Sequence, residues 1–279
     1  MATLSAPGVI DITATSARPQ VTLTYDELAL LIASLYGNNE DGVALTIGPD
    51  TCFTDTARTT PAAVNDAVAG VTDQSGNGYH PTQPTAGYRP ILRQDANGKY
   101  YLEFDGNDDH LLIDAPNMTR NIGYITMAAG AKITNTAAVG AIFYASGAAG
   151  DANTRSSIRL NGANQEFGVG GRRLDSDSLM YLTTTAPTGN FSTVSYIDHA
   201  NALAEVRINK TSAVGPSAFL TAGSTSDTAS NIVSVGSVAT TTSSNFNGDV
   251  YSVFVVIREI SAGELADLEN YLYSTTGQT

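Results

Sequence analysis

The sequence lacks tryptophan, has one cysteine and contains no apolar run of about 18 residues. A single thiol cannot form an internal disulfide and does not suggest a cysteine-based metal site, so Cys52 is expected to be a small core residue. Residues 1–20 have neither the basic start nor the apolar core of a secretory signal. We therefore expect a soluble chain that is made in a cytoplasm.

Basic residues are also few. The 279 residues include 14 Lys and Arg against 27 Asp and Glu, which gives a net charge of -13. This charge opposes binding to phosphate backbones and anionic membranes, so we expect neither nucleic acid nor a membrane as a partner. The histidines, His80, His110 and His199, occur singly, and there is no HExxH or Gly-x-Ser-x-Gly pattern. Zinc-dependent and nucleophilic catalysis therefore have no support.

Glycine and β-forming aromatic residues are abundant, with 26 Gly, 13 Tyr and 8 Phe. Short candidate strands cover residues 99–104, 123–133, 139–145, 157–160, 179–184, 191–198, 203–209, 232–236 and 249–259. The segment 203–209 alternates like a half-exposed strand, whereas 250–257 is apolar almost throughout and predicts a strand buried in mid-sheet. The pattern predicts an all-β fold, a two-sheet antiparallel jelly-roll sandwich.

One helix is predicted before the β region. Thr24 and Glu27 have the spacing of a capping box, and Gly37 offers a left-handed stop. Its apolar stripe consists of Leu28, Leu31, Ile32 and Leu35. The stripe could dock on the domain's own core or form an oligomer contact. Residues 1–40 are thus predicted to be an N-terminal arm and helix that anchor the chain or contact another copy.

A second helix is predicted after the β region, where Ser261 and Glu264 again have capping-box spacing. No repeat of fixed period occurs, so residues 41–279 are expected to form one jelly-roll domain. Within it, residues 221–245 are dominated by Ser, Thr, Ala and Gly. This composition predicts exposed strands and loops, or alternatively a contact surface.

Three motifs follow one another in this domain. Asp73 and the Ser75 to Gly78 turn precede Arg89-Pro90, then comes a Phe104 to Gly106 turn, and Gly248 opens a hydrophobic strand that leads into an acidic, Leu-rich helix. From about Pro49 to the C-terminus the chain resembles the laminin-G-like or concanavalin A-like jelly-roll domains of bacteriophage and prophage virion structural proteins.

The resemblance implies a non-enzymatic, virion-associated structural protein of a tailed bacteriophage, serving as a capsid decoration or tail-adhesion module. The expected location is a virion assembled in the host bacterial cytoplasm. Other virion proteins are the expected partners, together with a homo-oligomer, for which a trimer would be common. The arm at residues 1–22 would then lie against a neighbour in the particle.

The same fold also serves lectins, so the alternative function is a carbohydrate-binding module that recognises host-surface glycans. Sugar rings stack on Trp or Tyr, and this chain has no Trp. Stacking would fall to Tyr79, Tyr88, Tyr100, Tyr101 or Tyr144. The competing interpretation makes these tyrosines ordinary sheet residues with a surface hydroxyl.

The acidic turn at the Phe104 to Gly106 motif is a candidate calcium site. Asp105, Asp108 and Asp109 offer carboxylate oxygens, with Asp73 as a further ligand if its loop folds over, and laminin-G-like domains often carry one calcium at a sandwich rim. In the competing interpretation, Asp105 caps the turn through backbone bonds while Asp108 and Asp109 face water.

Glycoside hydrolysis is not expected. Glucanases of this fold resemble one another in a Glu-x-Asp-x-(x)-Glu strand, whose two glutamates flank the scissile bond. The nearest match is Glu103-Phe-Asp105 followed by Asp108, where Gly106 and Asn107 break the strand and the second glutamate is missing.

Overall fold

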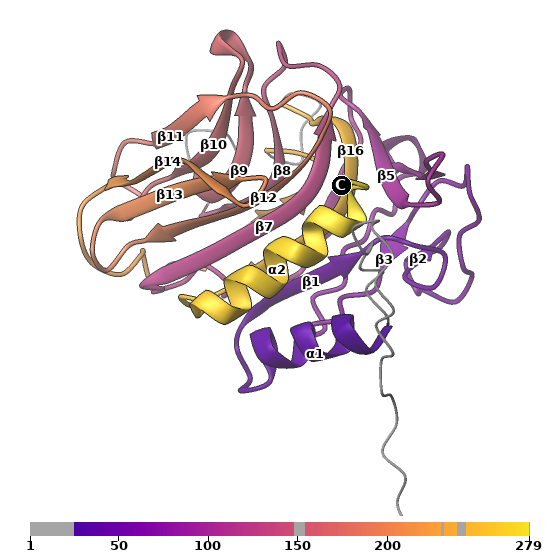
Figure 1. Cartoon of the computed structure of the whole chain (residues 1–279), viewed down its shortest axis with the longest axis horizontal. Coiled ribbons are helices and arrows are strands. Elements are labelled where there is room, and N and C mark those ends of the chain that lie inside the picture. The colour runs from indigo at the N-terminus through magenta and orange to yellow at the C-terminus, as the bar shows by residue number, and fades with distance from the viewer. Residues whose placement is uncertain (1–24, 148–153, 230–231, 239–243, 279) are drawn as a thin grey trace, which may run out of the picture.

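The computed structural model describes residues 25–147, 154–229, 232–238 and 244–278. Within these ranges the protein is a two-sheet antiparallel jelly-roll sandwich, with one helix before the strands and one helix after them along the chain. This confirms the predicted fold class (Figure 1). No helix in the described part of the chain has both the length and the apolar character needed to cross a membrane.

The larger sheet has eight strands among the described residues. In spatial order they are β14 (Thr211–Ala218), β13 (Leu203–Ile208), β12 (Asn190–Asp198), β7 (Tyr124–Ile133), β16 (Asn247–Val256), β5 (Tyr100–Asp105) and β4 (Ile91–Gln94), and β1 (Gly42–Thr46) also pairs with β16. The β1 register ends at Ser252 and the β5 register ends at Val250, so β1 and β5 lie end to end beside β16. Tyr251 falls at their junction, where the pairing of β16 with β7 also shifts register.

The smaller sheet faces the first across the core. Its strands, in order, are β11 (Met180–Thr185), β10 (Glu166–Gly171), β9 (Thr154–Asn161), β8 (Gly140–Ser146), β15 (Ile232–Val235) and β6 (Leu111–Ile113), and β2 (Cys52–Phe53) pairs with β3 (Gly70–Val71) as a separate ladder. β15 lies between two strands and is wholly buried. The prediction of exposed structure throughout 221–245 is therefore wrong for this strand, whose apolar side chains fill both faces.

The core between the sheets is built from alternating strand residues. Phe104, Phe167 and Phe191 are among its largest buried side chains, and Cys52 has no exposed surface, as expected for a small core residue. β16 supplies Val250, Val253 and Val255 to this core and pairs with strands on both edges. This confirms the prediction of a strand buried in mid-sheet.

Two helices cover the outer face of the larger sheet, α1 (Tyr25–Tyr36) and α2 (Ala262–Thr275) (Figure 1). Leu35 of α1 and Leu268 of α2 pack with Phe254 of β16 in one buried cluster. The stripe of α1 thus docks on the chain's own sheet, because Phe254 points away from the inter-sheet core and needs cover.

The capping box of α2 is confirmed, since the Glu264 N–H donates to Ser261 Oγ (3.2 Å) and the Ser261 N–H donates to Glu264 Oε2 (2.7 Å). Arg258 Nη2 bonds Glu264 Oε1 at 2.6 Å and lowers the pKa of that carboxyl to about 2. The same nitrogen donates to the Leu35 carbonyl at the end of α1 (3.1 Å), so Arg258 joins the helices. Thr24, the predicted cap of α1, lies outside the described residues.

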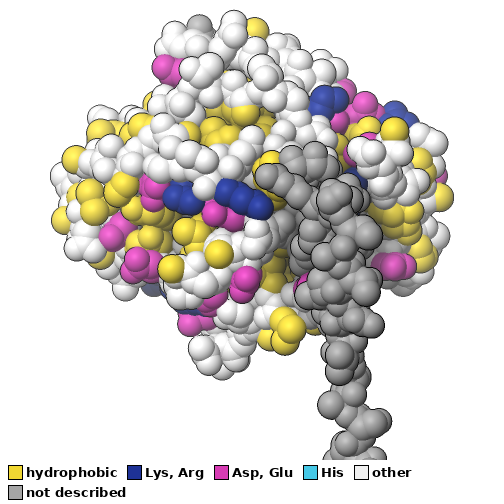
Figure 2. All heavy atoms as spheres, viewed as in Figure 1, with side chains coloured by type: hydrophobic (Ala, Val, Ile, Leu, Met, Phe, Trp, Pro, Cys, Tyr) yellow, Lys and Arg dark blue, Asp and Glu magenta, His cyan; other side chains and the backbone are white. Residues whose placement is uncertain are grey.

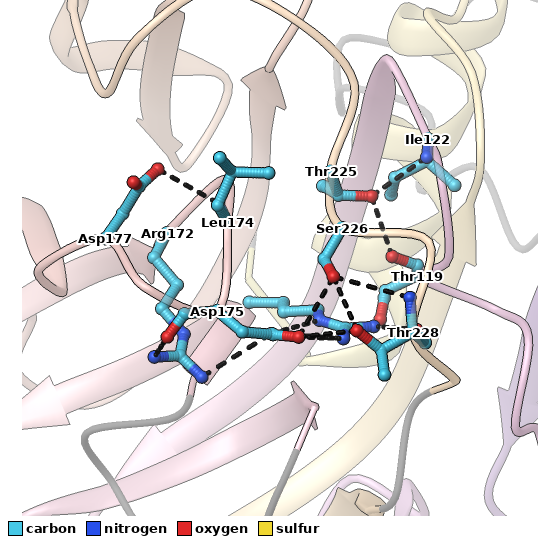
Figure 3. Close-up of polar contacts among 10 residues, drawn as sticks. Thr119, Ile122, Arg172, Leu174, Asp175, Asp177, Thr225, Ser226 and Thr228 are labelled. Atoms are coloured by element: carbon cyan, nitrogen blue, oxygen red, sulfur yellow. Dashed lines mark hydrogen bonds and ion pairs between the residues drawn. The ribbon is translucent and has the colours of Figure 1, made fainter.

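The loop 221–228 is held by a polar network (Figure 3). The Asp175 carboxylate accepts hydrogen bonds from Ser226 Oγ (2.9 Å) and Thr228 Oγ1 (2.6 Å), and both side chains turn toward it. Arg155 Nη2 pairs with the same carboxylate at 3.1 Å. Because Arg155 has no exposed surface, this ion pair fastens the loop to the smaller sheet.

A buried histidine lies next to this loop. The Gly223 N–H donates to the His199 carbonyl at 2.8 Å. The His199 ring has no exposed surface, and neither ring nitrogen has a hydrogen-bond partner among the described residues. Burial lowers its pKa to about 4, with the charge of Arg173 adding to the shift and that of Asp198 opposing it. The imidazole is therefore neutral in the folded protein at neutral pH.

Candidate functional site

Strand β5 presents a polar row on the outer face of the larger sheet. Leu102 and Phe104 are buried in the core, so Tyr101, Glu103 and Asp105 alternate to the opposite face. This alternation places one aromatic ring and two carboxylates along a rigid strand, which is a suitable support for a binding site.

A pocket of about 380 Å³ opens beside this row. We call it the acidic pocket, and it is lined by Ile91, Arg93, Glu103, Phe104, Asp105, Asp109, Thr134, Asn247 and Asp249. The strand register explains the set, because Ile91 of β4 and Asp249 of β16 both pair with Glu103. Figure 2 shows basic and acidic side chains together at the upper right of the face, on the side of the molecule where β5 lies in Figure 1.

Two carboxylates of the acidic pocket are paired with cations. Arg93 Nε contacts Glu103 Oε2 at 2.6 Å, and Arg93 Nη1 also donates to Asn65 Oδ1. Lys132 Nζ lies 3.5 Å from Asp249 Oδ2. Burial raises the pKa of Asp249, and the nearby charge of Glu103 adds to this shift while Lys132 opposes it. The pocket thus has hydrogen-bond donors and acceptors close to one another.

The acidic turn closes one side of the pocket. Asp105 Oδ1 accepts the backbone N–H groups of Asn107 (2.8 Å) and Asp108 (3.3 Å), so Asp105 does cap the turn. Asp109 Oδ2 accepts the Asp105 N–H at 3.0 Å, which draws Asp109 inward to 7% exposure. The expectation that Asp109 faces water is therefore wrong. Burial raises the pKa of Asp109 to about 7, and the charges of Asp105 and Asp108 contribute.

The turn has oxygen atoms that could serve as ligands of a calcium ion. One carboxylate oxygen from each of Asp105, Asp108 and Asp109 lies within 4.8 Å of the others. Asn245 is 1% exposed and donates through Nδ2 to the Asn107 carbonyl, and its own Oδ1 has no hydrogen-bond partner in the part of the chain that the structure describes. Carboxylate and amide oxygens on a short turn are the ligands that calcium takes, so these residues would hold the ion by neutralising its charge.

Asp73 does not join this cluster. Its Oδ1 accepts the N–H groups of Ala44 (3.0 Å) and Ser75 (2.9 Å), and its Oδ2 accepts the Tyr79 N–H (3.0 Å). Asn77 Nδ2 donates to the Gly42 carbonyl at 2.9 Å. The Ser75 to Gly78 turn is therefore a corner that fastens the segment after β3 to β1.

A second pocket, of about 180 Å³, lies at the junction of β1 and β5. We call it the tyrosine pocket, and it is lined by Thr46, Ile47, Gly98, Lys99, Tyr100, Tyr251, Tyr271 and Thr275. Tyr101 links it to the acidic pocket, since its ring lies 5.3 Å from that of Tyr251 between centroids. The polar row of β5 thus runs from an aromatic pocket to an acidic one.

The predicted stacking tyrosines are not gathered in one place. Tyr100 lines the tyrosine pocket, whereas Tyr79 is half-buried against the core and Tyr88 packs its ring on His110 at 5.7 Å. Burial, with the nearby Asp41 carboxylate, raises the pKa of Tyr79 to about 12. Tyr144 has no exposed surface, so its predicted role in stacking a sugar is wrong. It is covered on the outer face of the smaller sheet by Ile232 and Val238.

Arg93, Asp249, Tyr251 and Tyr271 are among the pocket residues that were not found from the sequence. Asp249 and Tyr251 stand two apart on β16, which is the spacing of one sheet face, but they belong to a run that reads as apolar. Tyr271 is 8% exposed on α2, and no local pattern distinguishes it from a core residue.

No family model matches this sequence, and no curated protein sequence matches it. Solved structures do match. The structure is similar to botulinum neurotoxin type C, solved in a study of its interaction with two ganglioside molecules, with 12% identity, a TM-score of 0.54, and coverage of 86% of this chain and 53% of that chain.

Two further structures are similar over most of this chain. The binding domain of Paraclostridial Mosquitocidal Protein 1 is 9% identical with a TM-score of 0.55, covering 88% of this chain and 53% of that one. Trypanosoma rangeli sialidase is 10% identical with a TM-score of 0.50, covering 91% and 40%. This chain thus spans about half or less of the length of these proteins. At such identities the similarity shows the fold alone.

Proposed function

We propose that this protein is a carbohydrate-binding module that recognises glycans on a host surface through the outer face of β5. The observation that carries the proposal is the adjacency of the two pockets along one strand. Sugar rings bind by stacking on aromatic rings such as Tyr101, and their hydroxyl groups bond to carboxylate and guanidinium groups such as Glu103 and Arg93.

The structural similarities support this proposal through the fold. The neurotoxin is described by its dependence on ganglioside molecules, and the mosquitocidal protein matches through a binding domain. A jelly-roll sandwich that presents a site on a rigid strand suits the same kind of recognition. Which sugar this chain binds is determined by its own pockets and cannot be inferred from those proteins.

We also propose that the module binds glycans without cleaving them. Glu103 is held by Arg93 at 2.6 Å and Asp249 lies 3.5 Å from Lys132, so both carboxylates that face each other across β5 and β16 have cationic partners. A retaining glycosidase needs a free carboxylate nucleophile beside a protonated acid. The other two carboxylates of the pocket, Asp105 and Asp109, are not free, because both accept hydrogen bonds from backbone N–H groups of their own turn. Incubation with bound oligosaccharides is expected to release no shorter products, and product release abolished by Glu103→Gln would contradict this proposal.

A glycan array probed with the full chain tests the binding proposal. Tyr101→Ala is expected to weaken binding by about three- to tenfold, since a stacked ring contributes about 0.5–1.5 kcal/mol. Tyr181→Ala is the matched control, because Tyr181 is 39% exposed on β11 of the other sheet. Both variants should keep the wild-type melting temperature within a few degrees. Equal loss in both variants, or no binding by the wild type, would count against the site.

We propose a virion of a tailed bacteriophage as the setting, with other virion proteins and further copies of this chain as partners. The support is the ordered set of motifs at Asp73, Arg89-Pro90, Phe104 to Gly106 and Gly248. Quantitative mass spectrometry of purified particles is the test. Hundreds of copies per particle indicate capsid decoration, a few dozen or fewer indicate a tail module, and absence overturns the setting.

A further inference from the structure

Carboxylates outnumber cations around the acidic pocket. Four acidic side chains line it, Glu103, Asp105, Asp109 and Asp249, against a single cation, Arg93. Arg93 and Glu103 are paired at 2.6 Å and neutralise each other. The other three carboxylates therefore decide the charge that a ligand meets.

These three carboxylates are weakly neutralised. Lys132 lies 3.5 Å from Asp249 and its own side chain is 44% exposed, so much of its charge faces water. Asp105 and Asp109 form no salt bridge among the residues that the structure describes. Their hydrogen bonds come from backbone N–H groups of the turn and, for Asp105 Oδ2, from Asn107 Nδ2 at 2.9 Å. The pocket consequently offers an excess of negative charge to whatever enters it.

When ionised, the four carboxylates that line the pocket accept hydrogen bonds and donate none. An ammonium group supplies three N–H donors and a positive charge, whereas a carboxylate supplies no donor and adds to the repulsion.

We infer that the acidic pocket selects glycans that carry a protonated primary amine, and rejects glycans that carry carboxylates. This inference rests on the proposed glycan binding and adds the charge of the ligand. Tyr101 and Asp105 lie on the same face of β5, four residues apart, a distance of roughly 14 Å at about 3.4 Å per residue. A ligand with a ring on Tyr101 and an amine near Asp105 is therefore an oligosaccharide.

The test is calorimetric titration of the full chain, in EDTA and near neutral pH, with three oligosaccharides of equal length. One is a glucosamine oligomer with free amines, one its N-acetylated form, and one a uronic acid oligomer. The amine oligomer is expected to bind about tenfold more tightly than the N-acetylated one, as for a charge-assisted hydrogen bond. The uronic acid oligomer is expected to bind most weakly.

Two variants assign the preference to the pocket. Asp249→Asn keeps the side-chain shape and is expected to reduce the preference for the amine to about twofold or less. Asp267→Asn removes an exposed carboxylate from α2 and is expected to keep it. Equal or tighter binding of the N-acetylated or uronic acid oligomer by the wild type would overturn the inference and leave glycan binding intact. Binding of none of the three would overturn glycan binding, and the inference with it.

Discussion

Replacing His199 by leucine is expected to stabilise the protein in mild acid. The His199 ring is fully buried with both nitrogens unpaired, and burial lowers its pKa to about 4. In the unfolded chain a histidine titrates near its ordinary value of about 6.5, so the unfolded state binds the proton more readily. The free energy of unfolding is then unaffected above about pH 6.5 and falls as the pH drops toward 4.

The two pKa values set the magnitude. A difference of about 2.5 pKa units, at about 1.4 kcal/mol for each unit, limits the loss to about 3.4 kcal/mol. At about pH 5 the same relation gives a loss of about 2 kcal/mol. Leucine is close to histidine in volume and cannot take up a proton. It also replaces two unpaired nitrogens, so stability at neutral pH is expected to be unchanged or slightly higher.

Urea unfolding of the wild type and His199→Leu, at about pH 7.5 and about pH 5, measures the effect. The expected result is a wild type that loses about 2 kcal/mol more than the variant between the two conditions. Equal losses in the two proteins would show that His199 does not titrate in this range, and would refute the reasoning from its burial. A variant that is much less stable at neutral pH would show that the imidazole has a partner.

Three further predictions concern the site and its support. Asp109→Asn is expected to raise the free energy of unfolding by about 2 kcal/mol in EDTA above about pH 7, because the raised pKa of Asp109 makes its ionised form costly in the folded state. Thermal unfolding should show that this gain vanishes near pH 4, where the carboxyl is protonated in the folded protein. Millimolar calcium is expected to raise the melting temperature of the wild type and not that of Asp109→Asn, which calorimetry can measure. Arg258→Met is expected to cost about 2 kcal/mol in urea unfolding, because it leaves the Glu264 carboxylate and the Leu35 carbonyl without their donor; an unchanged midpoint would contradict that role.

Local patterns were enough to predict the main strands and the second helix. Nine strand segments coincide with observed strands, because each has a β-rich run bounded by turn residues. β10 was missed, since its Glu166–Gly171 sequence is half glycine and reads as a turn. β14 was missed because Gly215 and Pro216 interrupt its pattern. Both are held by pairing with a neighbouring strand, which no local rule contains.

The site was found only in part for a related reason. A turn sequence indicates Asp105 and Asp109, and a place on a predicted strand indicates Tyr100. Asp249 and Tyr251 become part of the site only through the register of β16 against β5, about 150 positions away in the chain. Tyr144 was misassigned because burial on the outer face of a sheet depends on segments that cross it, and the strand sequence does not show them.

The place of β16 in the larger sheet has a consequence for synthesis on the ribosome. β16 follows every other described strand along the chain, yet it forms the seam that joins β7 to both β1 and β5. During translation, Gly42 to Thr46 and Tyr100 to Asp105 must wait with their edges unpaired until residues 247–256 emerge. The domain is therefore expected to complete its fold only after residues 247–256 have left the ribosome, and nascent chains that stop before β16 should be prone to aggregate or to engage chaperones.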